Sequence, residues 1–318
     1  MRGRVSGKGE LMNTELASSL RALALACALT IPAAVSAQPT EAAKAEFAAA
    51  VDAANKAAIP GPSDVKLVDQ ALLKLPAGLV YYPSAQAGRL LSAMGNRAGE
   101  GLLGMVIAPD ADWFIVMRFT KSGYIKDDDA KEWNVGDLLK GMKEGTEESN
   151  KERKSRGLAE IEVVGWVEAP KYEATTHRLV WALESKEKGA PATAERGVNY
   201  NTYALGRDGY ISMNLVTGLQ SVQAEKPVAH SLLAALQYNE GKRYADFNSS
   251  TDHVAEYGLA ALIGGVAAKK LGLFALAFAF LAKFAKVIGI AAIALGAVFI
   301  KFFRKKKDEV PPAAPPQA

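Results

Sequence analysis

The sequence predicts an α+β fold, an antiparallel meandering sheet flanked by helices, plus a C-terminal transmembrane helical segment. Two patterns indicate this: strand-like segments follow one another between helix-like segments, and a long apolar run lies near the C-terminus. The chain has 318 residues, of which 49% are apolar, which is enough for a hydrophobic core. We expect one extracytoplasmic domain between the two ends.

The first half of this domain mixes helices with short strands. Residues 41–58 are rich in strong helix formers and stop at the Pro-Gly-Pro of 60–62. The segment 112–125 predicts two strand pieces joined as a hairpin around residues 121–123, because glycine favours such a loop. The other expected elements here are a strand at 79–84, a helix at 85–96 closing near Gly95, and a helix at 135–157 ending at Gly157.

The second half predicts the main sheet. Leu179, Trp181 and Leu183 alternate with their neighbours, as in a strand with one face against a core. Strands are expected at 161–170, 176–185, 197–206 and 210–218, with a tight turn at 206–209, then a helix at 226–238 and a polar loop at 239–253. We expect Ser250 or Thr251 to cap a long helix that begins near Asp252.

Residues 1–37 have the pattern of a signal peptide. Basic residues precede the apolar run 22–31, Pro32 follows it, and small residues before Gln38 favour cleavage after Ala37. An uncleaved anchor is the alternative. The single cysteine, Cys27, lies in this segment, so the mature chain would have no disulfide and no thiol ligand.

The opposite end predicts a membrane anchor. Residues 285–303 would span about 28 Å as a helix, close to the thickness of the hydrocarbon core. The segment 256–284 is apolar too, and its part 257–282 either crosses the membrane or lies in the interface. The predicted organisation is 1–37 signal peptide, 38–255 extracytoplasmic domain, 256–284 apolar or interfacial helix, 285–303 transmembrane helix and 304–318 basic, proline-rich cytoplasmic tail.

Basic residues set the orientation. Lysines and an arginine directly follow the last apolar run, which predicts a cytoplasmic C-terminus and a periplasmic main domain. Small residues in the C-terminal helices would allow a homo-oligomer, and a lysine stripe could contact membrane lipid. The membrane-facing basic residues are Lys269, Lys283, Lys286, Arg304, Lys305, Lys306 and Lys307.

Three consecutive acids, Asp127, Asp128 and Asp129, are the weak candidates for a metal site. Their spacing does not fit a calcium loop, which places oxygens at alternate positions. We expect them in a turn before the helix at 135–157, where negative charge is favourable. The competing hypothesis is a metal-dependent envelope hydrolase that uses these acids with Tyr124 or His177. No catalytic motif is recognised, so no catalytic residue and no cofactor is assigned.

A second polar region lies in the predicted strand 197–206. Asn199, Asn201 and Tyr203 alternate along it, so amides and an aromatic ring share one face of the sheet. This face is either exposed or a binding surface. The net charge of +4 comes without a long basic stripe interleaved with aromatics, which argues against nucleic acid as a partner.

Several long segments together resemble a bacterial membrane-anchored family, domain of unknown function 2167. They include DWFIVMRFTKSGYIKDDDAKEWN, VVGWVEAPKYEATTHRLVWALES, VNYNTYALGRDGYISMNLV and GKRYADFNSSTDHVAEYGLAALIGGVAAKKLG. The resemblance covers most of residues 65–303. It implies an exported domain with a C-terminal membrane anchor and no assigned activity or site residues. From the two membrane-addressing ends and the lack of a catalytic motif, we expect a non-enzymatic binding or scaffolding module in the periplasm, anchored in the bacterial inner membrane, whose partner is another envelope protein or lipid.

Overall fold

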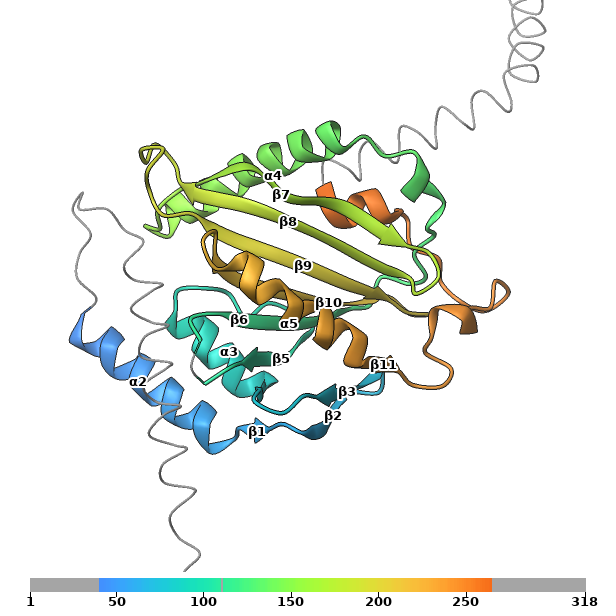
Figure 1. Ribbon diagram of the computed structural model, residues 1–318, viewed down its shortest axis with the longest axis horizontal. Helices are drawn as coiled ribbons and strands as arrows, with labels where there is room; N and C mark the ends of the chain where they lie inside the picture. Colours follow the sequence, from blue (N-terminus) through green and yellow to red (C-terminus); the bar gives the residue numbers. More distant parts are fainter. Residues whose placement is uncertain (1–39, 110, 265–318) are drawn as a thin grey trace, which may run out of the picture. The chain divides into compact units, whose positions relative to one another are not determined.

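The structure is a computed structural model that describes residues 40–109 and 111–264 (Figure 1). The chain divides into two compact units, 1–269 and 270–318, and all described residues belong to the first. The predicted signal peptide and the segments from residue 265 onward, with all seven membrane-facing basic residues, lie outside the described residues. Within the described ranges, no helix has the length and apolar character needed to cross a membrane.

An 8-stranded antiparallel sheet forms the centre of the described unit, in the order β1-β4-β5-β6-β10-β9-β8-β7. Each of the five strands predicted at 79–84, 161–170, 176–185, 197–206 and 210–218 is confirmed. The strands are β1 (Ile59–Pro60), β4 (Val80–Pro83), β5 (Leu102–Ile107), β6 (Phe114–Thr120), β7 (Ile161–Glu173), β8 (Arg178–Glu187), β9 (Gly197–Leu205) and β10 (Tyr210–Gly218). The tight turn at 206–209 is confirmed as well, with Gly206 N donating to the Gly209 carbonyl.

A second sheet of three strands was not expected. Its order is β11-β3-β2, and the strands are β2 (Ser63–Leu67), β3 (Ala71–Leu75) and β11 (Leu236–Tyr238). The predicted helix at 226–238 was wrong in its last turn, because residues 236–238 pair with β3. Leu236 lies opposite Leu73 and is buried there. That pairing joins segments far apart in sequence, so local periodicity could not indicate it.

The helices lie close to the predicted positions, although the last of them begins at residue 222 rather than at 226. They are α2 (Glu41–Lys56), α3 (Ser84–Ala93), α4 (Val135–Ser155) and α5 (Val222–Ala235). Thr40 caps α2 by accepting a hydrogen bond from Ala43 N. Gly95 and Gly157 follow α3 and α4 with positive φ angles, which suits glycine after a helix.

The two faces of the large sheet are covered differently. On one face, Tyr200, Ile211 and Met213 pack with Leu232 of α5 and with the three-stranded sheet; α5 crosses in front of β9 and β10 in Figure 1. On the other face, α2 and α3 cover β4–β6. There α4 and residues 259–263 pack with side chains of β7–β9.

The hairpin predicted at 112–125 is wrong. Strand β6 pairs with β5 and β10, and the chain then leaves the sheet. Tyr124 instead forms a parallel bridge with Val254. Gly123 permits this approach, because a Cβ there would lie 2.6 Å from the His253 carbonyl oxygen. The glycine that suggested a hairpin loop therefore allows contact with a distant segment.

The helix expected from Asp252 also begins elsewhere. Residues 252–258 are not helical, and helical structure starts at residue 259. Neither Ser250 nor Thr251 caps it. Both lie in a turn where Ser250 bonds to Asn248 and Thr251 to Asp252. Contacts with the domain, described next, determine where this helix begins.

Candidate functional site

The three consecutive acids, Asp127, Asp128 and Asp129, differ in their hydrogen-bonding partners. Asp127 Oδ2 accepts a hydrogen bond of 2.7 Å from the Tyr172 hydroxyl. Both carboxylate oxygens of Asp129 accept backbone N–H groups at 3.0 Å, one from Leu259 and one from Ala260. Asp128 is exposed at the start of the 3-10 helix η1 (Asp128–Lys131). The acids therefore serve separate contacts.

The helix that Asp129 stabilises is a different one from the helix expected. The N-terminus of α4 is capped by Asn134, whose Oδ1 accepts from Gly136 N at 2.8 Å and Asp137 N at 3.1 Å. Asp129 instead caps the helical residues 259–264, which follow it far along the chain. A carboxylate at a helix N-terminus satisfies free N–H groups and interacts favourably with the helix dipole. The charge was correctly assigned to a helix start, but to the wrong helix.

Four rings form a continuous stack beside Asp127. Ring centroids are 4.0 Å apart for His177–Tyr244, 4.3 Å for Tyr244–Tyr124 and 3.8 Å for Tyr124–Phe247, all in stacked geometry. The Tyr244 hydroxyl donates to the Ile125 carbonyl at 2.8 Å. Such aromatic pairs contribute about 0.5–1.5 kcal/mol each beyond the area they bury. The stack joins the turn before β8 to the loop that precedes residue 254.

Tyr172 links Asp127 to His177. Its hydroxyl lies 2.7 Å from Asp127 Oδ2 and 3.1 Å from His177 Nδ1. Burial, and then the hydrogen bond with Asp127, raise the pKa of Tyr172 far above its ordinary value, so the phenol stays protonated. A phenol has one proton, which the carboxylate accepts, so the ring N–H of His177 donates to Tyr172. The arrangement is a carboxylate–tyrosine–histidine relay.

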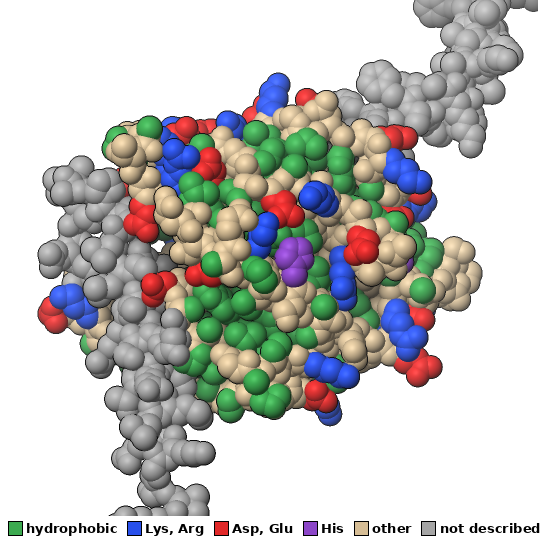
Figure 2. Space-filling view, viewed as in Figure 1, with side chains coloured by type: hydrophobic (Ala, Val, Ile, Leu, Met, Phe, Trp, Pro, Cys, Tyr) green, Lys and Arg blue, Asp and Glu red, His purple; other side chains and the backbone are tan. Residues whose placement is uncertain are grey.

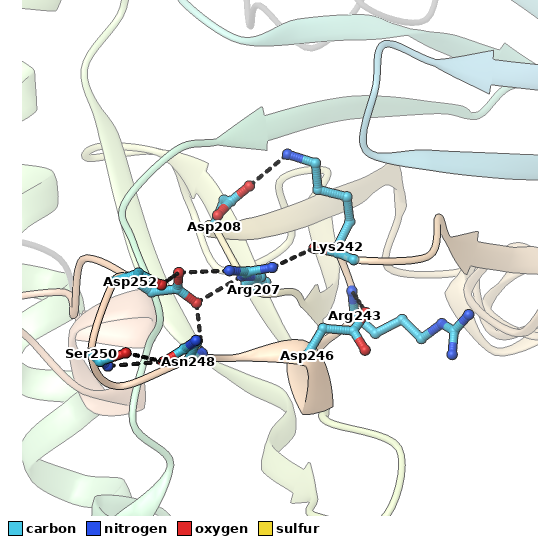
Figure 3. Close-up of polar contacts among 10 residues, drawn as sticks. Arg207, Asp208, Lys242, Arg243, Asp246, Asn248, Ser250 and Asp252 are labelled. Atoms are coloured by element: carbon cyan, nitrogen blue, oxygen red, sulfur yellow. Dashed lines mark hydrogen bonds and ion pairs between the residues drawn. The ribbon is translucent and has the colours of Figure 1, made fainter.

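A polar network fixes the loop that carries Tyr244 and Phe247 (Figure 3). Arg207, in the turn between β9 and β10, makes two hydrogen bonds of 2.7 Å to Asp252. Asp208 in the same turn accepts from Lys242 at 2.8 Å. The hydrogen bond from Arg207 lowers the pKa of Asp252, with help from the Asn248 backbone N–H. The paired fork geometry holds the loop in one register.

Residues 254–264 are fixed at several points. Tyr124 N donates to the His253 carbonyl, and Ala255 N donates to the Tyr124 carbonyl, both at 2.8 Å. Leu259 is fully buried in the cluster beneath α4. We call the residues that hold this segment, Tyr124, Asp129, Tyr244 and Phe247, the anchor. The anchor residues act through hydrogen bonds and packing, which are interactions suited to holding residues 254–264 in place.

For metal chemistry, the structure brings Asp127 close to one of its two suggested partners, His177, while Tyr124 lies in the ring stack with Tyr244 and Phe247. His177 Nδ1 lies 3.8 Å from Asp127 Oδ2. Throughout residues 40–109 and 111–264, however, no three His, Cys, Asp or Glu side chains converge as metal ligands would. The oxygens of Asp129 are occupied by backbone N–H groups.

A second relay of the same kind lies on the face covered by α5. The Tyr200 hydroxyl is 3.0 Å from Glu168 Oε2 and 2.7 Å from His230 Nε2, and Lys226 is 3.6 Å from Glu168. Figure 2 shows a histidine on this face with acidic and basic side chains around it. Register shifts in β7 around residue 168 set the direction of Glu168. Sequence reasoning missed this group because its members come from three elements.

The predicted polar face of β9 is present. Asn199, Asn201 and Tyr203 lie on one face, opposite the α5 side, and all three are half-buried. Asn199 Oδ1 accepts from Asn214 Nδ2 at 3.1 Å, and Asn201 Nδ2 donates to the Asn199 carbonyl at 3.2 Å. Tyr203 stacks on Tyr210 with centroids 5.1 Å apart. The face is neither fully exposed nor filled by apolar side chains.

Comparison with known proteins identifies the family. Residues 59–296 match the family described as protein of unknown function DUF2167. The chain belongs to this family. No protein of curated function matches this DUF2167 chain. A solved structure, the solution structure of cyanobacterial PsbP (CyanoP) from Synechocystis sp. PCC 6803, is similar with 11% identity and a TM-score of 0.32, over 54% of this chain and 88% of that one. A likeness at that TM-score supports no argument.

Proposed function

We propose that this DUF2167 chain is a membrane-tethered binding module of the bacterial envelope, whose α+β domain works in the periplasm without catalysis. The apolar run 285–303, the basic residues after it and the signal-like start support the tether and its orientation. In this proposal the domain contacts another envelope protein or lipid, and the C-terminal helices allow self-association.

The observation that carries the proposal is the two-point contact between Asp129 and the N–H groups of Leu259 and Ala260. It fixes the start of the segment that leads into the apolar run. A freely jointed tether would need no such contact, whereas a domain that must present one surface at a set height above a membrane would. The buried side chain of Leu259 adds to this fixation.

Topology reporters test the tether. The full chain is expressed in a bacterium with a fluorescent protein, which matures only in the cytoplasm, fused after Ala318. A parallel chain carries alkaline phosphatase, which is active only in the periplasm, at the same point. We expect fluorescence without phosphatase activity, and the chain in the membrane fraction after an alkaline wash.

A matched truncation ending at residue 264 keeps the described domain and removes the apolar run. The truncated chain should be absent from the membrane fraction. In vivo cross-links to an envelope partner that form with the full chain should be weaker or absent with the truncated chain. Phosphatase activity without fluorescence, or a truncated chain that keeps both membrane association and cross-links, would contradict the proposal.

A further inference from the structure

One outer strand of the three-stranded sheet is unpaired along its outer side. Strand β2 ends the order β11-β3-β2, and it lies at the lower border of the described unit in Figure 1. In the described part of the chain, residues 63–66 make backbone hydrogen bonds with no segment other than β3. Free N–H and C=O groups along a strand edge form a template for pairing with another strand.

The other sheet edges are protected in ways that β2 is not. At one edge of the large sheet, β7 has three register shifts, which interrupt the regular spacing of its backbone groups. Strand β1 has only two residues, and β11 has three. In contrast, β2 pairs with β3 over five residues without a register shift. Its outer edge is therefore regular enough to accept a further strand.

The exposed face of β2 carries one charge of each sign. Asp64 and Lys66 are both exposed, and their side chains lie on the same face because they are two residues apart in a strand. Neither side chain has a hydrogen bond or ion pair in the described part of the chain. Val65, between them, is 4% exposed and belongs to the core. The strand thus offers a carboxylate and an ammonium group at a fixed spacing.

These charges are complementary to those of a second copy of β2. When two copies pair antiparallel about a two-fold axis at Val65, Asp64 of each copy lies opposite the partner's Lys66. A slip by one residue would place buried side chains opposite exposed ones. The next register on either side would place Asp64 opposite itself or Lys66 opposite itself, which is repulsive. Charge therefore favours the register centred on Val65.

The two ends of β2 add an apolar contact to this pair. Val68 directly follows the strand, is 64% exposed and has a φ of 49°, which is uncommon for a β-branched residue. Pro62 directly precedes the strand and is exposed as well. With the axis at Val65, Val68 of each copy comes beside the partner's Pro62. Pairing would remove from water the one large apolar side chain that is exposed among the described residues.

We propose that this chain forms a homodimer through β2, in which the two strands pair antiparallel around Val65 and join the two small sheets into one. Asp64 and Lys66 set the register, and Val68 packs beside the partner's Pro62. The inference goes beyond the proposed function, because it assigns self-association to the domain and not to the C-terminal helices. Two short strands bury a small interface, so we expect dimerisation to depend on protein concentration.

A carbodiimide cross-linker tests the contact itself, because it joins a carboxylate directly to a neighbouring amine. Equal amounts of ¹⁴N- and ¹⁵N-labelled full chain are mixed in detergent, cross-linked, digested and analysed by mass spectrometry. We expect a product that joins Asp64 to Lys66 and carries one light and one heavy peptide, which identifies it as intermolecular. Products that join these residues only within one chain would overturn the inference.

Charge reversal tests the register. Lys66→Asp sets carboxylates opposite each other in the pair, and Asp64→Lys sets amines opposite each other; each should raise the dimer dissociation constant about tenfold in sedimentation equilibrium. An equal mixture of the two variants restores opposite charges and should associate like the wild type. Lys66→Asp is the cleaner variant, because Asp64 also lies opposite Lys74 of β3. Lys143→Asp reverses an exposed charge on α4 and should leave the constant unchanged.

Val68→Asn separates association from folding. Asparagine adopts a positive φ more readily than valine, so the melting temperature should rise, whereas loss of the apolar contact should weaken the dimer. A monomeric wild-type chain would overturn the inference. Dimerisation that neither charge reversal changes would also overturn it, and would leave the C-terminal helices as the site of self-association. The topology reporters test the tether independently of both results.

Discussion

Replacing Asp129 by alanine tests whether the anchor holds residues 259–264. The change removes a carboxylate that accepts two N–H groups at 3.0 Å and leaves those donors partly buried without a partner. Loss of a helix cap costs about 1 kcal/mol, and an unsatisfied buried donor costs about 1–3 kcal/mol. We therefore expect local opening of this helical segment to become easier by about 2 kcal/mol, a factor of about thirty in the opening equilibrium.

Hydrogen exchange of the full chain, measured by mass spectrometry, reports the local opening of this helical segment. Amides of residues 259–263 should exchange about thirtyfold faster in Asp129→Ala, whereas amides of β9 and β10 should change little. Asp128→Ala is the matched control, because Asp128 is exposed and its side chain has no hydrogen bond or ion pair in the described part of the chain. Equal exchange of residues 259–263 in the two variants would refute the assignment of Asp129 as their cap.

Four further outcomes are expected. Gly258→Ala should also speed hydrogen exchange at residues 259–263, since a Cβ there would lie 2.5 Å from Asp129 Oδ2. Gly145→Ala, where the added Cβ meets open space on α4, should stabilise that helix by up to about 1 kcal/mol and raise the melting temperature. The folded-state pKa of Asp252 is lowered, so the contribution of its carboxylate to folding stability is present above the unfolded pKa of about 4 and is lost as the pH falls from there toward the folded pKa. The melting temperature of Asp252→Asn should therefore depend less on pH than that of the wild type between about 5 and 2.5. Tyr172→Phe removes a half-buried hydroxyl with two partners and should destabilise the fold by about 1–2 kcal/mol in denaturant titration. An unchanged midpoint would contradict the relay.

Local patterns predicted most of the elements correctly. Alternation of Leu179, Trp181 and Leu183 identified β8 and its buried face, which is confirmed by their burial beneath α4. Gly95 and Gly157 marked helix ends, as their positive φ angles show. These signals succeed because side-chain periodicity and glycine conformation depend on neighbours within a few residues.

Predictions that needed a distant partner failed. The glycine at 123 indicated a hairpin, but its role is to let residue 253 approach. Part of the second sheet was missed because β11 pairs with β3, which lies far earlier in the chain, whereas β2 and β3 form a local hairpin that was simply not predicted. The pairing of Asp129 with Leu259, and of Glu168 with Tyr200 and His230, likewise has no local signature.

By itself, the sequence determined the α+β class, the order of the main strands and helices, and the family. Those properties follow from short-range pattern and from long motifs read in order. Only the tertiary structure decided which helix receives the carboxylate of Asp129, which rings stack on Tyr124, and that β2 forms an outer edge of the three-stranded sheet. The physical reason is that hydrogen bonds and ring contacts depend on distance in space, which sheet pairing sets between residues that sequence order keeps apart.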